Sequence, residues 1–105
     1  MTQKDIYDYL KSNPLNVAVH VGSLEEMNGK DYIFLDFTTD ELIGSDDKGE
    51  YQTAIQMTVA TKDWKTRIQL VRFIMEKFNV SVTYETSREF QYYLAKCNTS
   101  VILYG

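Results

Sequence analysis

Few side chains in this sequence could do covalent or acid–base chemistry. His20 is the only histidine and Cys97 the only cysteine of the 105 residues. A thiolate beside an imidazole would be an activated nucleophile, but no local signature surrounds Cys97, and His20 alternates with valines as on a strand. The sequence favours a sheet histidine and a cysteine that fills space as a small apolar residue, and it leaves a Cys–His pair open. We therefore expect a protein that is not an enzyme.

The strongest concentration of charge lies in residues 40–50. This segment carries one base, Lys48, and five acids, so its charge of −4 equals the formal net charge of the whole chain. It lies between two segments that alternate like strands, which predicts the tip of a long β-hairpin. We expect an acidic tip of this kind to contact a partner. Its acids are Asp40, Glu41, Asp46, Asp47 and Glu50.

The same segment does not match a calcium-binding loop, in which oxygen ligands recur at fixed positions. Counted from Asp40, two ligand positions fall on Leu42 and Gly44; counted from Asp46, one falls on Lys48. The glycines of the chain are scattered and form no phosphate-binding motif. We expect a solvated loop without a metal or another cofactor, and a weak, nonspecific cation contact stays open.

The helix expected after residue 61 is partly basic, with acids interspersed. Such a mixture is usually a solvated face. It could also receive the acidic loop of a neighbouring copy, which would be a head-to-tail contact of the type that closes into rings. A phenylalanine on the opposite side of the helix could be a second subunit contact. The possible subunit contacts are Lys62, Lys65, Arg67, Arg72 and Phe73.

The composition is that of one globular domain. The chain is 44% hydrophobic and 25% charged, which are ordinary values, and its 105 residues are near the commonest domain length. A single cysteine excludes an intrachain disulfide framework, no stretch approaches the roughly 20 apolar residues of a membrane helix, and the N-terminus lacks the apolar core of a signal peptide. We expect one domain over residues 1–105, kept in a cytoplasm, without specific nucleic-acid binding because the net charge is negative.

Hydrophobic periodicity predicts the element order α–β–β–β–α–β–β–β. A short helix over Thr2–Ser12 begins with a capping-box pattern at Thr2 and Asp5 and stops at Asn13-Pro14. Because only one connection is long enough for a helical crossover, we expect a two-layer α+β fold whose mostly antiparallel sheet carries one long helix on a face. The expected strands are 17–21, 32–38, 51–61, 80–85, 90–97 and 100–104.

The long helix is the strongest of these predictions. It covers Asp63–Phe78, and its apolar residues recur at intervals of four, three, four and three. Leu70 and Ile74 widen the apolar stripe on the same side. The residues of the stripe are Trp64, Ile68, Val71, Met75 and Phe78.

The order of these elements is similar to that of a known family. A short helix ending near Asn13-Pro14 precedes a hairpin with a long polar tip. The strand over Tyr51–Thr61 then runs straight into the amphipathic helix Trp64–Phe78, and the chain closes with β-strands. Over essentially the whole chain, this arrangement resembles the tail terminator (tail completion) and head–tail joining proteins of long-tailed bacteriophages and prophages.

The resemblance implies a structural virion protein of a phage tail or neck. Proteins of this family form hexameric rings that cap the tail tube and provide the surface that joins the head. The implied partners are therefore further copies of the chain, the tail tube protein and a head-completion or connector protein, with assembly in the bacterial cytoplasm and no membrane. The acidic tip would face an adjoining ring or the lumen, where like-charge repulsion lets DNA pass.

The residues also permit a different reading of the acidic segment. It could belong to a small inhibitor or immunity-type binding module that acts as a monomer or dimer. In that case the acidic loop would cover a basic site on another protein through complementary charge.

Overall fold

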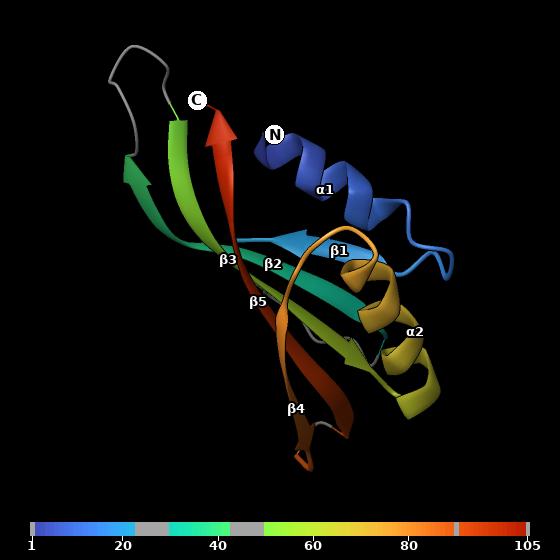
Figure 1. The fold of residues 1–105 in the computed structure, drawn as a ribbon. Coiled ribbons are helices and arrows are strands. Elements are labelled where there is room, and N and C mark those ends of the chain that lie inside the picture. Colours follow the sequence, from blue (N-terminus) through green and yellow to red (C-terminus); the bar gives the residue numbers. More distant parts are fainter. Residues whose placement is uncertain (1, 23–29, 43–49, 90, 105) are drawn as a thin grey trace.

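The two helices and five strands of the described chain form two layers (Figure 1). The structure is a computed structural model that describes residues 2–22, 30–42, 50–89 and 91–104. Both helices cover one face of a sheet whose strand order is β1-β2-β3-β5-β4, so the predicted two-layer α+β fold is confirmed. The elements are α1 (Gln3–Lys11), β1 (Ala18–Val21), β2 (Tyr32–Leu42), β3 (Glu50–Thr61), α2 (Trp64–Met75), β4 (Ser81–Ser87) and β5 (Tyr92–Tyr104).

The sheet is mixed, with one parallel pair. β2–β3, β3–β5 and β4–β5 are antiparallel, as expected for most of the sheet, whereas β1 pairs with β2 in parallel. β1 has only four residues and therefore spans about 13 Å. The ten residues from Gly22 to Asp31 can span up to roughly 33–36 Å, so they are long enough to return the chain to the start of β2 without a helix.

The N-terminal helix follows its predicted signals. The hydroxyl of Thr2 accepts from the amide of Asp5 at 3.2 Å, and the Asp5 carboxylate accepts from the amide of Thr2 at 2.9 Å, so the capping box is present. After the helix, the buried Asn13 donates to the carbonyls of Leu10 and Val17 and accepts from the Val17 amide. These three bonds satisfy the Asn13 side chain and fix the turn from α1 into β1.

The helix layer and one sheet face bury the main core. Alternate positions of β2, β3 and β5 point toward the helices, which follows from the period of two along a strand. Ile6 and Leu10 of α1 are fully buried there. The other core residues are Ile33, Leu35, Ile55, Met57, Val59, Leu70, Val71, Ile74, Phe78, Ala95, Cys97 and Leu103.

The prediction of one long helix is wrong. α2 has 12 residues and α1 has nine, and neither described helix is long and apolar enough to cross a membrane. α2 begins at its cap Asp63, whose carboxylate accepts from the amide of Lys65, but it ends at Met75. The chain then turns, because Phe78 packs into the core and the Asn79 carbonyl is held by the hydroxyl of Thr99 at 2.8 Å.

The predicted strands 90–97 and 100–104 are one strand, β5. The turn-like pair Asn98-Thr99 stays extended because it is paired on β3, with Gln56 and Ile55 opposite. The Gln56 amide donates to the Asn98 side chain at 3.2 Å. Cross-strand bonding on both sides therefore overrides the local turn preference.

The β2–β3 hairpin is confirmed, and its strands are longer than predicted. Pairing continues beyond a bulge at residue 38 as far as Leu42, which lies opposite Tyr51. Figure 1 shows this end of the hairpin projecting away from the helices, and the molecule measures 47 Å along its longest axis. The predicted loop over residues 40–50 is thus shortened to the segment between Leu42 and Glu50, and residues 43–49 lie outside the described part of the chain.

Candidate functional site

The two side chains with catalytic potential lie far apart in the sheet. His20 is on the edge strand β1, where its ring meets the Tyr32 ring edge-on at 6.0 Å, on the face away from the helices. Cys97 is fully buried on β5, on the face toward the helices, with β2 and β3 between the two strands. A Cys–His nucleophile is therefore not formed by this chain.

The Cys97 thiol is expected to make stability fall at alkaline pH. Burial raises its pKa from the ordinary 9.0 to about 11, because the thiolate is disfavoured in the core. Because the pKa is higher in the native state, the thiol contributes to the free energy of unfolding. This contribution is complete below pH 9 and is lost as the pH rises through 11. Urea unfolding should show that the free energy of unfolding falls more between pH 8 and pH 10.5 for the wild type than for Cys97→Ala. Equal decreases in the two proteins would contradict the burial of the thiol.

Within the described residues, no three His, Cys, Asp or Glu side chains come together as a metal site. Asp40 and Glu41 belong to β2 and Glu50 to β3, whereas Asp46 and Asp47 lie outside the described residues. The predicted acids are thus carried in part by the paired strands of the projecting hairpin.

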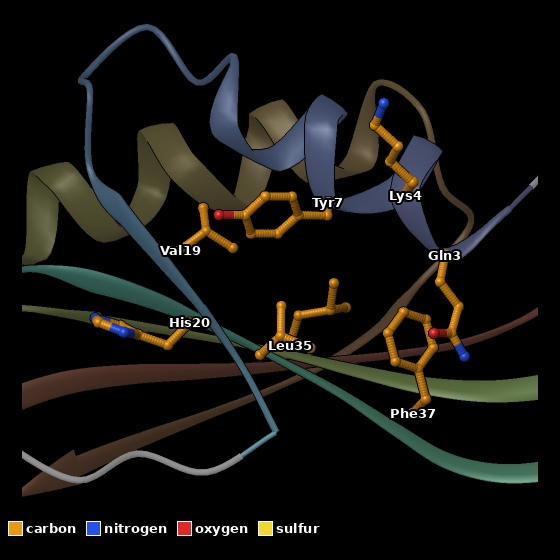
Figure 2. A pocket seen from close by; sticks show the side chains of 8 residues that line it. Gln3, Lys4, Tyr7, Val19, His20, Leu35 and Phe37 are labelled. Atoms are coloured by element: carbon orange, nitrogen blue, oxygen red, sulfur yellow. The ribbon is translucent and has the colours of Figure 1, made fainter.

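An apolar groove of about 500 Å³ lies between α1 and the edge of the sheet (Figure 2). Figure 2 shows Tyr7 of α1 facing Val19 above Leu35, while Gln3 and Phe37 lie together at one end. Val21 is 47% exposed at the open edge of β1. Its lining residues are mostly apolar and also include Lys4 and His20.

Three of the four predicted basic residues gather at the N-terminal end of α2. Lys62 lies just before the helix, with its Nζ 4.1 Å from the centre of the Tyr92 ring. The Nζ of Lys65 lies 5.8 Å from the centre of the Trp64 ring. The third, Arg67, is on the first turn and a half of α2. Arg72 is exposed in the last turn and stands apart from this group.

Arg67 has the most unusual surroundings of the group. Its guanidinium carbon lies 4.9 Å from the Tyr84 ring centre and 5.5 Å from that of Tyr93. One N–H donates weakly to the Leu94 carbonyl at 3.4 Å, and the buried Nε has no hydrogen-bond partner among the described residues. No described carboxylate pairs with Arg67, so aromatic faces hold its guanidinium. Its Nε–H donor remains without a hydrogen-bond partner among the described residues.

A depression of about 480 Å³ lies between Lys62 and the chain that joins β4 to β5, and we refer to it as the basic hollow. Tyr93 borders both the hollow and the Arg67 guanidinium. Among the described residues that line it are two bases, Lys62 and Arg88, and no acid. Its lining residues are Lys62, Thr86, Ser87, Arg88, Gln91, Tyr92 and Tyr93.

Phe73 does not project freely from α2. Its ring stacks on Tyr9 with centres 4.5 Å apart and planes 8° apart, and the Tyr9 hydroxyl donates to the Phe73 carbonyl at 2.6 Å. Burial is the main cause that raises the pKa of Tyr9, with Glu76 adding to it. Phe73 therefore joins α1 to α2 within one molecule, which leaves its predicted role in subunit contact untested.

Sequence reasoning missed the residues that complete the basic end. Arg88 lies between β4 and β5, and Tyr84 and Tyr93 belong to strands that follow α2 by many residues. The one available signal was the high content of eight tyrosines, which indicates polar–aromatic surfaces without locating them.

Comparison with models of known protein families finds no match for this sequence, and comparison with curated proteins finds none either.

Proposed function

We propose that this protein is a structural component of a phage tail or neck, which forms a ring that terminates the tail tube and joins it to the head. One observation carries the proposal: a helix-covered sheet from which a β2–β3 hairpin with an acidic end projects. The second strand of this hairpin, β3, leads directly into α2, as the resemblance requires. The partners would be copies of the chain, the tail tube and a head-completion protein.

The two edges of the sheet support assembly with other copies. β1 and β4 are the outermost strands, so each has one side without a paired strand in the described sheet. Apolar side chains lie exposed on both, Val21 on β1 and Tyr84 on β4. Open edges with exposed apolar residues favour contact with another chain.

The proposal is tested by light scattering after size exclusion over a wide range of concentrations, with negative-stain imaging of the heaviest peak. Rings with six-fold symmetry, or rings that form only on added tail tubes, are the expected result. A protein that stays monomeric at every concentration and never binds tail tubes would overturn it.

The high negative charge of residues 40–50 also favours a second function, that of an acidic inhibitor or immunity-type binding module. Such a module would bind a basic site on another protein as a monomer or dimer. Tight one-to-one binding of a heterologous protein, together with the absence of rings, would favour this function over the virion role.

A further inference from the structure

We propose that the outer edge of β4 pairs with the β4 edge of a second copy of this chain. The two strands would run antiparallel about a two-fold axis at Tyr84 and would join the two sheets into one. This contact goes beyond the proposed function, because a two-fold contact is not the head-to-tail contact of a six-fold ring. It concerns the free protein and does not depend on the ring.

The edge of β4 lacks the features by which sheet edges usually avoid pairing. Such edges are commonly short or bulged, or they carry lysine or proline. β4 has seven residues, and none of them is lysine or proline. It pairs with β5 in unbroken register from Ser81 to Ser87, and it is the outermost strand of the described sheet. Because the backbone groups of alternate residues turn outward, β4 offers a regular row of donors and acceptors.

The side chains of β4 suit a strand pair. Val82, Tyr84 and the threonines of the strand are of types that are favoured in sheets. Glu85 is the only charged residue of β4, and its carboxylate already lies 3.3 Å from the Nζ of Lys96. Tyr84 is 55% exposed, and the guanidinium carbon of Arg67 lies 4.9 Å from its ring centre. This contact limits the freedom of the ring beforehand, so less entropy is lost on pairing.

The sequence of β4 is self-complementary about Tyr84. With the axis there, Tyr84 lies opposite its own copy, and the strands pair over their whole length. Val82 then faces Thr86. Thr83 faces Glu85, so no two like charges are opposed. An axis at Glu85 would oppose two carboxylates, and an axis at Thr83 would leave the last two residues of β4 without a strand residue opposite.

A second β4 is a better partner for this edge than β1. β1 has four residues, so it could pair with little more than half of β4, whereas a second β4 pairs with all seven. A second β4 also brings the exposed Tyr84 ring, and aromatic side chains opposed across an antiparallel pair stabilise it. One strand pair is small compared with a permanent interface, so we expect a dimer that dissociates on dilution.

Sedimentation velocity over a wide range of concentrations tests the contact. We expect a monomer–dimer equilibrium that Tyr84→Lys weakens at least about tenfold, because two lysines then oppose each other at the axis. The matched control is Ile102→Lys, at an exposed apolar position of β5 beyond the residues that pair with β4, and it should leave the equilibrium unchanged. A wild type that stays monomeric, or a dimer that Tyr84→Lys does not weaken, overturns the proposal. Equal weakening by Val21→Lys would place β1 in the contact and overturn it too.

Disulfide cross-linking tests the register without relying on charge. Tyr84→Cys places two thiols directly opposite each other, with Cβ atoms about 4.5–5.5 Å apart, so glutathione disulfide should oxidise them to a bond that links the dimer. Glu85→Cys is the control, because its two thiols would lie on a diagonal at about 7–8 Å. Cys97 is fully buried, so the native thiol should not react. Cross-linking of Glu85→Cys in place of Tyr84→Cys would overturn the axis at Tyr84.

The outcomes also separate this contact from the ring. Six-fold rings on tail tubes, formed by a protein that is monomeric when free, would leave the proposed function standing and overturn the contact. A dimer that cross-links through Tyr84→Cys, but never forms rings or binds tail tubes, would keep the contact and remove the ring function.

Discussion

Replacing Ile74 with alanine is expected to lower the free energy of unfolding by about 2–5 kcal/mol, the range for large-to-small changes in a closely packed core. Ile74 is fully buried and, with Leu70 and Val71, forms the apolar side by which α2 packs on the sheet. A helix of 12 residues is marginal by itself in water, so its stability depends on this packing. The loss should appear as a lower midpoint of urea unfolding with an unchanged slope.

The neighbouring Met75 provides the matched control. It is 55% exposed at the end of α2, so Met75→Ala should change stability by no more than about 0.5 kcal/mol. The sequence pattern placed Met75 on the apolar stripe and Ile74 at its margin. Equal losses in the two variants would therefore contradict the packing of α2 in the structure and agree with the stripe read from the sequence.

The sequence was most informative where structure is determined by neighbouring residues. The capping box at Thr2 and Asp5 and the stop after α1 depend on side chains a few positions apart, and both are present. The alternation along residues 32–38 and 51–61 predicted two strands, and both are present as β2 and β3. These features could be predicted because a short-range pattern and the final environment favour the same conformation.

Long-range pairing explains the errors. A period of two does not reveal strand direction, so the parallel pairing of β1 with β2 was not visible. Asn98-Thr99 has the composition of a turn, but both residues pair with β3, and Asn98 also pairs with Ser81 of β4, which keeps the segment extended. The C-terminal end of α2 was predicted too late because the apolar stripe continues to Phe78. Phe78 lies beyond the end of the helix but is still buried in the core.

The candidate site also combines features that local sequence reveals with features that depend on long-range pairing. The bases of the helix segment were found from their clustering in sequence, whereas the basic hollow is created by the meeting of β3, β4 and β5. Arg88 and Tyr93 join Lys62 only because β4 and β5 pair across the sheet. Residues that far apart carry no shared local signal, so the hollow could not be located without the fold.

Replacing Tyr92 with alanine is expected to lower the free energy of unfolding by about 3–5 kcal/mol, the range for removing a large buried aromatic ring. Tyr92 is 1% exposed and belongs to a second core, with Tyr32 and Ala60, on the sheet face away from the helices. Its ring meets that of Tyr32 edge-on with centres 5.5 Å apart. Removal leaves a cavity that the surrounding residues close only in part.

The phenylalanine variant separates the ring of Tyr92 from its hydroxyl. The hydroxyl donates to the Lys30 carbonyl at 2.8 Å, so Tyr92→Phe should lower stability by about 0.5–1.5 kcal/mol, the net value of one hydrogen bond. Tyr84→Phe is the control, because Tyr84 is 55% exposed and its hydroxyl should contribute little. Tyr92→Phe also keeps the aromatic face beneath Lys62. Chemical unfolding that ranks Tyr92→Phe with Tyr92→Ala would show that the hydroxyl, and not the ring, holds this core together.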